Sequence, residues 1–203
     1  MFYSSRQAAV TRGVVIMKHL ISILALSALL AAMGCERGSK DSTEVAEDQN
    51  ERSLSNRVED DADFAVDAAD GGLLEVELGT LAGSKASSSE VKAFARMMVE
   101  DHGKANAQLT KIAQQKNIAL PSRMSNEHQR KYERLREKSG QDFDKEYIDL
   151  MVEDHKDDIE DFEEQVREGN DQELKNWAEM NLPLLRQHLQ EAERLKQALA
   201  NQR

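Results

Sequence analysis

Two copies of one pentapeptide carry the side chains best suited to chemistry. Met-Val-Glu-Asp-His occurs at residues 98–102 and again at residues 151–155, a separation of 53 residues. Each copy combines an imidazole, two carboxylates and a thioether, which are groups that bind metal ions or transfer protons. A third histidine, His188, also follows two apolar residues at helical spacing. The chemistry of the chain is therefore expected at His102, His155 and His188.

The three histidines are expected to point into the interior of a helical protein. Each has apolar residues three and four positions earlier, and positions three and four apart share one helix face. All three lie about 15 to 18 residues from the nearest predicted turn, and thus at similar depths along their helices. Glu75 is the obvious fourth member. The spacing predicts a buried polar layer of Glu75, His102, His155 and His188.

Three interpretations of this layer compete. The favoured one is a hydrogen-bonded network that fixes helix register, because buried polar groups must be satisfied. The second is a soft metal site, since Met98 and Met151 each lie four residues before a histidine, and thioethers with imidazoles favour copper(I). The third is a carboxylate-bridged di-iron site, which expects Glu-x-x-His on two helices; that motif does not occur in the chain. Copper or iron is thus the expected metal cofactor of the two metal interpretations.

The acidic residues of the repeat differ in their expected positions. Asp101 and Asp154 lie about 100° around the helix from their histidines, where they can orient an imidazole of a neighbouring helix. Glu100 and Glu153 lie about 200° away and are expected in solvent. The acidic run over residues 153–164 lacks the glycine and the alternating oxygens of a calcium loop, so a solvated helix face is expected there.

Apolar residues at helical spacing predict the elements that carry these side chains. Four long helices are expected at roughly 61–84, 88–116, 142–168 and 172–200, with a shorter helix at about 125–138. No strand pattern is found. The sequence therefore predicts an all-α protein, a ferritin-like four-helix bundle with a short extra helix in the long connection between helices two and three.

Turn and capping residues set the expected boundaries. Ser87 with Glu90 forms a capping-box pattern before the second long helix. Asn117 is expected to end that helix, Gly169 to end the third and Asp171 to cap the fourth. Tight turns would join helices one to two and three to four, so an approximate twofold axis relating the two pairs is expected. The pentapeptide repeat is interpreted as the trace of that duplication.

Residues 1–34 have the pattern of a secretory signal peptide. A short cationic region begins at Met17, and residues 20–33 form an apolar run that is shorter than the roughly 20 residues of a membrane-spanning helix. Residues 1–16 are untypical of a signal, which favours Met17 as the true start of translation. Cys35, the single cysteine, follows in a pattern that resembles the lipobox of bacterial lipoproteins. We expect Cys35 to be lipidated; the alternative is cleavage by the general signal peptidase.

The rest of the chain is acidic. Three of the 27 basic residues and none of the 38 acidic residues precede Cys35, which leaves 24 basic against 38 acidic residues, formally −14. This balance argues against a nucleic-acid partner and favours cations or basic partners. Residues 35–60 carry almost no apolar pattern, so a disordered acidic tether is expected, followed by the bundle domain at residues 61–203. We expect an extracytoplasmic lipoprotein, anchored to the membrane through Cys35 and facing the periplasm, with an envelope protein or a cation as its partner.

Several stretches resemble a known family over residues 63–199. The stretches 75–79, 99–102, 152–155 and 182–188 are similar to a bacterial envelope family named domain of unknown function 4142. The resemblance implies a ferritin-like helical fold and an extracytoplasmic location, and it implies no activity. The chain has no nucleophile elbow, phosphate loop, zinc-cysteine pattern or dinucleotide fingerprint. We therefore expect a non-enzymatic binding or structural module, with a metal-binding or redox protein as the alternative.

Overall fold

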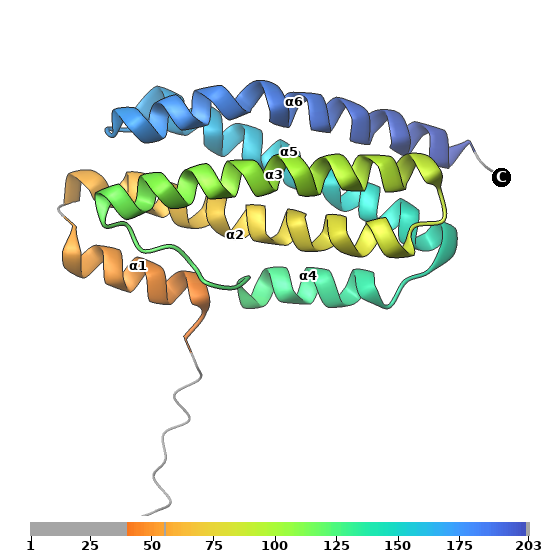
Figure 1. Cartoon of the computed structure of the whole chain (residues 1–203), viewed down its shortest axis with the longest axis horizontal. Helices are drawn as coiled ribbons and strands as arrows, with labels where there is room; N and C mark the ends of the chain where they lie inside the picture. The colour runs from red at the N-terminus through yellow and green to blue at the C-terminus, as the bar shows by residue number, and fades with distance from the viewer. Residues whose placement is uncertain (1–39, 55, 202–203) are drawn as a thin grey trace, which may run out of the picture. The chain divides into compact units, whose positions relative to one another are not determined.

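The computed structural model describes residues 40–54 and 56–201, and over these residues it contains helices and no strands (Figure 1). The predicted signal peptide and Cys35 lie outside the described residues. Over the described part of the chain, no helix combines the length and the apolar character needed to cross a membrane. The helices are, in order, α1 (Ser42–Ser53), α2 (Asn56–Lys85), α3 (Ser89–Lys116), α4 (Asn126–Arg136), α5 (Gly140–Glu168) and α6 (Gln172–Ala200).

Four of these helices form a bundle, as predicted. α2 packs mainly on α3, α5 packs mainly on α6, and the two pairs meet through α2 with α5 and α3 with α6. α2 and α6 run in one direction, whereas α3 and α5 run in the other (Figure 1). α3 and α5 are therefore parallel helices on one diagonal of the bundle. The long connection between them carries α4, which packs along α2.

The predicted helix boundaries are mostly confirmed, because local signals determine them. Asn117 ends α3 in the left-handed conformation (φ 57°), and Gly169 follows the last residue of α5. Asp171 caps α6 by accepting hydrogen bonds from the amides of Glu173 and Leu174. One cap is shifted by a residue: Ser88, and not Ser87, accepts from the first amides of α3.

The expectation of a disordered tether over residues 35–60 is wrong for residues 42–53, which form α1. Asp41 and Glu44 make a capping box at its start. The helix has almost no apolar stripe, and a buried amide attaches it instead: Asn50 Nδ2 donates to the Ala119 carbonyl (3.0 Å), and the Ala119 amide donates to Asn50 Oδ1 (2.7 Å). α1 also packs on α2, but the backbone that Asn50 binds lies 69 residues away in the sequence, where no local pattern indicates it.

Two buried aspartates stabilise the turns of the bundle reciprocally. Asp144 on α5 accepts hydrogen bonds from the amides of Ser87 and Ser88 in the turn between α2 and α3. Asp61 on α2 accepts from the amides of Asn170 and Asp171 in the turn between α5 and α6. Each pair of helices thus supplies the carboxylate that the turn of the other pair requires. This reciprocity supports an approximate twofold axis that relates α2 to α5 and α3 to α6.

The interpretation of the pentapeptide repeat as a trace of this duplication is wrong. The two copies lie on α3 and α5, which are the second helix of one pair and the first helix of the other. A twofold that exchanges the pairs does not exchange these two helices. α3 and α5 run in the same direction, so the two copies of the pentapeptide have the same orientation along the bundle axis. Both copies also point their histidine toward His188. The repeat therefore places two histidines at one level of the bundle.

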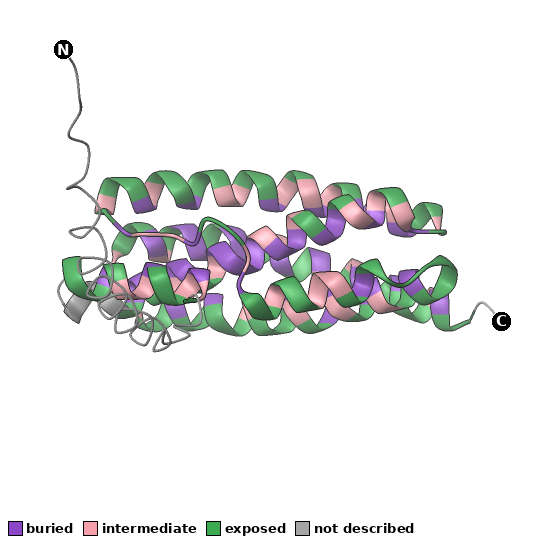
Figure 2. Ribbon diagram, turned by 90° about the horizontal axis from the view of Figure 1, so that it is seen from below, coloured by how far each residue is buried: buried purple, intermediate pink, exposed green. Residues whose placement is uncertain are grey.

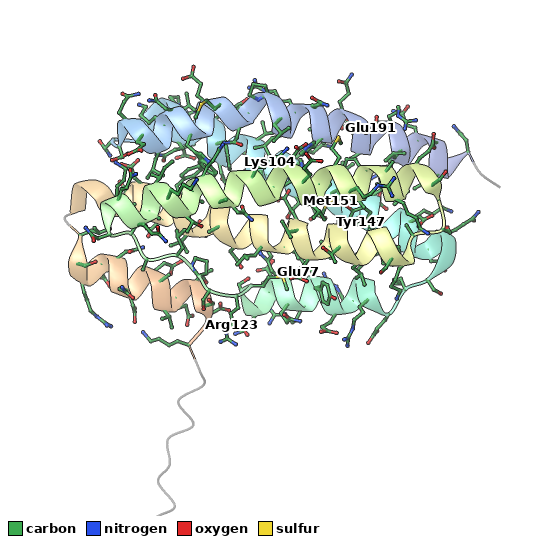
Figure 3. All side chains as sticks on the ribbon, viewed as in Figure 1. Glu77, Lys104, Arg123, Tyr147, Met151 and Glu191 are labelled. Carbon is green, nitrogen blue, oxygen red and sulfur yellow. The ribbon has the colours of Figure 1, made fainter. Side chains whose placement is uncertain are left out.

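Two apolar clusters fill the interior, and buried positions line the inner faces of the helices (Figure 2). Tyr147 and Met151 lie inside the bundle, whereas Glu77 and Lys104 lie on its exposed surface (Figure 3). One cluster includes Leu78, Phe94, Met98, Tyr147 and Met151; the other includes Leu109, Phe162, Leu174, Trp177 and Leu185. Along α3, α5 and α6, a histidine lies between the residues that the helix contributes to the two clusters, and on α2 Glu75 follows Leu74, the first residue of that helix in the cluster of Tyr147 and Met151.

Candidate metal centre

One polar residue from each bundle helix contributes to the layer between the apolar clusters. Glu75 comes from α2, His102 from α3, His155 from α5 and His188 from α6. Their exposed fractions are 1%, 5%, 0% and 0%. These are the four residues for which the sequence predicts a shared buried layer, and the structure brings them together.

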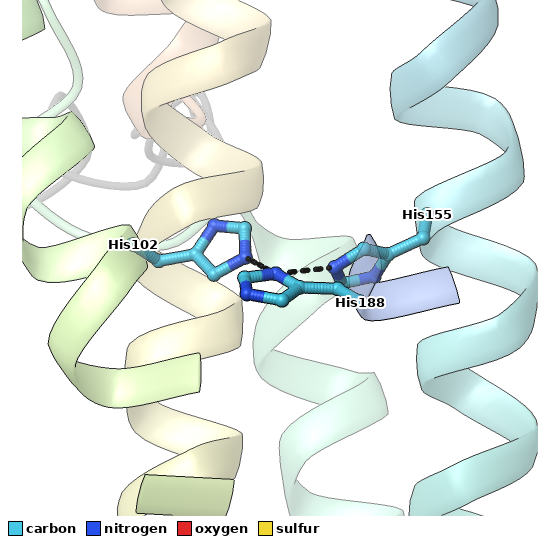
Figure 4. A group of neighbouring side chains, drawn as sticks. All are labelled: His102, His155 and His188. Atoms are coloured by element: carbon cyan, nitrogen blue, oxygen red, sulfur yellow. Dashed lines mark hydrogen bonds between the residues drawn. The ribbon is translucent and has the colours of Figure 1, made fainter. Parts of the chain in front are cut away.

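Three imidazole nitrogens converge at the centre of this layer (Figure 4). His188 Nδ1 lies 3.1 Å from His102 Nε2 and 3.4 Å from His155 Nε2. All three atoms lie within 4.8 Å of one another. In a tetrahedral site with metal–nitrogen bonds of about 2.0–2.1 Å, ligand nitrogens are about 3.3–3.4 Å apart. The two distances that meet at His188 Nδ1 are close to that separation.

The other nitrogen of each ring faces a carboxylate oxygen. His102 Nδ1 lies 2.5 Å from Glu75 Oε2, and His188 Nε2 lies 3.2 Å from Asp101 Oδ2. His155 Nδ1 is 3.5 Å from Glu75 Oε1, and neither atom has a well-aligned hydrogen bond. Carboxylates behind metal-binding imidazoles fix their orientation and raise their basicity. The arrangement has the outer carboxylates that such a centre requires.

Burial controls the charges of these groups. It lowers the pKa of His102 and of His188 to about 4, and burial together with the two neighbouring rings lowers the pKa of His155 well below its usual value. All three rings are therefore neutral at neutral pH. Burial, reinforced by the nearby Asp154, raises the pKa of Glu75 well above its usual range.

The Glu75–His102 contact allows two proton arrangements. A neutral Glu75 donates to His102 Nδ1, and His102 Nε2–H then donates to His188 Nδ1, which makes a hydrogen-bonded chain. An ionised Glu75 instead accepts the Nδ1 proton of His102, and the Nε2 lone pair then faces the centre. A proton and a metal ion are thus alternative occupants of the same small volume, and the layer is chemically suited to both.

The two aspartates of the repeat differ in position. Asp101 contacts His188 on the neighbouring helix α6, as predicted. Asp154 points elsewhere: its nearest cation is Lys131 Nζ at 4.0 Å, and its Oδ2 is buried without a hydrogen-bond partner. No described contact joins Asp154 to a histidine ring, so the predicted orienting role does not apply to it. The reason is that α5 packs on α2 and α6, and its Asp154 flank faces α4.

Packing accounts for the burial of the repeat methionines. Met98 and Met151 are both 0% exposed and belong to the apolar cluster that contains Phe94 and Tyr147. Methionine commonly fills irregular core space of this kind. Ligation of a metal by either thioether stays a prediction.

Asp158 is a further candidate ligand that the sequence did not predict. A carboxylate oxygen of Asp158, an oxygen of Glu75 and a ring nitrogen of His155 all lie within 4.8 Å of one another. Burial, and then the charges of Glu75 and Asp154, raise the pKa of Asp158 well above its usual value. Its position three residues after His155 was a usable signal, because such pairs share one helix face. Asp158 was missed because it lies within the acidic run over residues 153–164, which was interpreted as a solvated helix face.

An acidic cleft runs beside this part of the layer. It has a volume of about 720 Å³ and lies between α1, α2, α4 and α5. Its walls include Asp67, Asp70, Asp154, Asp157, Asp158 and Asp161. Burial and the neighbouring carboxylates of Glu47 and Asp161 raise the pKa of Asp67 to about 6. Asp158 also lines a second, smaller cavity of about 20 Å³ that reaches Glu75 and His102, and this volume suffices for one water molecule.

Comparison with known proteins identifies the family. No curated protein and no solved structure matches the chain. A family model described as "Domain of unknown function (DUF4142)" matches residues 43–195, which include α1 and all four ligand candidates of the layer. The match covers most of the 203 residues and agrees with the resemblance carried by the sequence motifs. The chain belongs to the DUF4142 family.

Proposed function

We propose that this protein binds one transition-metal ion between His102 Nε2, His155 Nε2 and His188 Nδ1. The observation that carries the proposal is the convergence of these three nitrogens, with contacts of 3.1 and 3.4 Å to the shared His188 atom. We infer a ferritin-like metal-binding bundle, an assignment that the direction of the helices and the long connector support.

The donor set restricts the identity of the metal. Three neutral imidazoles suit zinc, copper, iron and nickel and do not suit calcium or magnesium. Copper and iron remain the redox-active candidates, and the di-iron arrangement is less favoured because Glu-x-x-His is absent from the chain. The cavity beside Glu75 and His102 provides room for a water molecule as a fourth ligand. We propose a mononuclear three-histidine centre with an open fourth position.

A specific observation favours a second function. With Glu75 protonated, the chain from Glu75 through His102 and His188 to Asp101 is a complete hydrogen-bonded network across three helices. Such a network can hold helix register without any metal. The second candidate is therefore a structural or binding module of the cell envelope, anchored as a lipoprotein through Cys35 and facing the periplasm.

Metal content separates the two candidates. The full chain, purified without an affinity tag, is dialysed against Zn²⁺ or Cu²⁺ and analysed by elemental analysis and calorimetry. We expect tight binding that is lost in His102→Ala and His188→Asn, with His128→Gln as the matched control outside the layer. Helix content is measured by circular dichroism to verify folding. Absence of binding at micromolar metal, with variants that change stability alone, would leave the structural module.

A further inference from the structure

We propose that a second cation position lies between Glu75, His155 and Asp158, beside the three-histidine centre and open to the acidic cleft. The inference extends the proposed function, because the ring of His155 would then serve two ions. The ligand class is a divalent transition-metal ion that accepts mixed nitrogen and oxygen donors, such as Zn²⁺, Co²⁺ or Fe²⁺.

Two unpaired buried atoms point to this position. Glu75 Oε1 and His155 Nδ1 lie 3.5 Å apart, and neither has a hydrogen-bond partner among the described residues. Glu75 is 1% exposed and His155 is 0% exposed, so both groups lie inside the bundle. Buried polar atoms are rarely left unpaired, and an unpaired one often indicates an ion or another ligand.

Asp158 completes the ligand set from the next turn of α5. One oxygen of its carboxylate lies within 4.8 Å of a carboxylate oxygen of Glu75 and of a ring nitrogen of His155. Ligand atoms around a four-coordinate zinc ion are separated by about 3.3 Å, so small side-chain rotations bring the three atoms to bonding distance. The set joins one nitrogen to two carboxylate oxygens, and the two carboxylates offset the charge of a divalent ion.

Among the three rings, the outer nitrogen of His155 has the longest carboxylate contact, 3.5 Å to Glu75 Oε1. The outer nitrogens of His102 and His188 already contact Glu75 Oε2 and Asp101 Oδ2. Glu75 can therefore retain the His102 contact through Oε2 and bind the second ion through Oε1. With both ions bound, His155 would hold one through Nε2 and the other through Nδ1, and the single proton of its neutral ring would pass to solvent.

Of the three ligand candidates, Asp158 lines the acidic cleft, so a cation would reach this position by way of the Asp158 carboxylate. Asp158 lines both the cleft and the small cavity that reaches Glu75. Gly71 lies opposite, where a Cβ atom would sit 3.6 Å from Asp158 Oδ1. The glycine therefore leaves the carboxylate open toward the cleft. A concave surface lined by like charges concentrates counter-ions, which favours cation capture at its inner wall.

Cobalt binding by the full chain tests the proposal. Co²⁺ is titrated into the untagged, metal-free protein, and bound metal is counted by equilibrium dialysis and followed by visible absorption. We expect two equivalents for the wild type, one for Asp158→Asn, and two for the matched control Glu160→Gln, an exposed acidic neighbour on α5 that does not line the cleft. Asp158→Ser is measured in parallel in case the asparagine variant does not fold.

The outcomes distinguish the two centres. One equivalent in the wild type that survives in the Asp158 variants and is lost in His188→Asn overturns the second position and leaves the three-histidine centre. One equivalent that is lost in the Asp158 variants and survives in His188→Asn overturns the three-histidine centre alone. Two equivalents in a folded Asp158 variant also exclude the second position, and no binding at all overturns both proposals.

Discussion

The ring of His188 shows how one side chain connects the interior of the layer to its surface. Its Nδ1 receives the contacts of two other imidazoles, while its Nε2 faces Asp101, whose side chain is 24% exposed. Asp101 is therefore a positioning residue: it would keep the His188 proton on Nε2 and the Nδ1 lone pair on the centre. Its sequence neighbour Glu100 is exposed and pairs with Lys104, so the two acids of one pentapeptide have separate roles.

Replacement of Asp101 tests this division. We expect Asp101→Asn to weaken metal binding about 10-fold, since an amide is a weaker acceptor for the Nε2 proton than a carboxylate. The thermal unfolding temperature of the metal-free protein should change little. Glu100→Gln is the matched control and should bind metal like the wild type. Equal affinities for the Asp101 variant and the control would show that Asp101 does not position His188.

Individual residues also show where sequence reasoning succeeds. The depth and direction of His102, His155 and His188 were predictable because both depend on spacing within a single helix. Asp158 was not predicted, since its proximity to Glu75 depends on how α5 packs against α2. Asp154 was expected to orient an imidazole of a neighbouring helix, but its flank faces α4, whose position no local pattern specifies.

At the scale of the elements, α4 is held to the bundle by a titrating pair. His128 Nδ1 on α4 lies 2.9 Å from Asp70 Oδ2 on α2, and the Ser125 amide donates to Asp70 Oδ1 (2.7 Å). Burial disfavours the charged forms of both side chains, but their mutual hydrogen bond and charge attraction outweigh this effect. The pKa of His128 is therefore raised and the pKa of Asp70 is lowered. Asp154 adds to the rise at His128, and Lys131 opposes it.

The attachment of α4 is therefore expected to depend on pH. A raised histidine pKa stabilises the fold fully below about 6.5 and loses this effect as pH rises through the folded value. A lowered aspartate pKa stabilises it fully above about 3.9 and loses this effect as pH falls. A double-mutant cycle with Asp70→Asn and His128→Gln should thus give a coupling free energy of about 1 kcal/mol near pH 5.5 that declines by pH 8.5. A coupling energy that rises with pH would contradict the assignment.

Some helices were predictable from local sequence patterns, and others were not. α3, α5 and α6 have apolar stripes and recognisable stops, so their bounds were predicted within a few residues. α1 has neither a stripe nor an aromatic residue, and Asn50 anchors it to a backbone segment far along the chain. The twofold relation was predicted from loop lengths, but the pentapeptide repeat was the wrong evidence for it.

At the scale of the whole molecule, we relate the acidic charge of the protein to its proposed membrane anchor. The acidic cleft gathers carboxylates from helices that are distant in sequence, and the chain as a whole carries a formal charge of −11. We propose that Cys35 holds this cation-attracting surface at the periplasmic face of a membrane. The helical domain itself has no span that would hold it there over its described residues.

Substitution of Cys35 tests the anchor. We expect the wild type to partition into the detergent phase after extraction of cell envelopes, and Cys35→Ser to partition into the aqueous phase. Metabolic labelling with a radioactive fatty acid should mark the wild type alone. Retention of the label by the serine variant, or an unlabelled wild type, would contradict the lipoprotein assignment.

Asp61 and Asp144 have a consequence for how the protein folds. The turn of each helix pair points its amides at a carboxylate that the other pair supplies, so neither hairpin contains the acceptor that its own turn requires. An isolated hairpin would leave those amides to water and would expose its apolar face. We therefore expect neither hairpin to fold alone and the two helix pairs to unfold together in one cooperative transition.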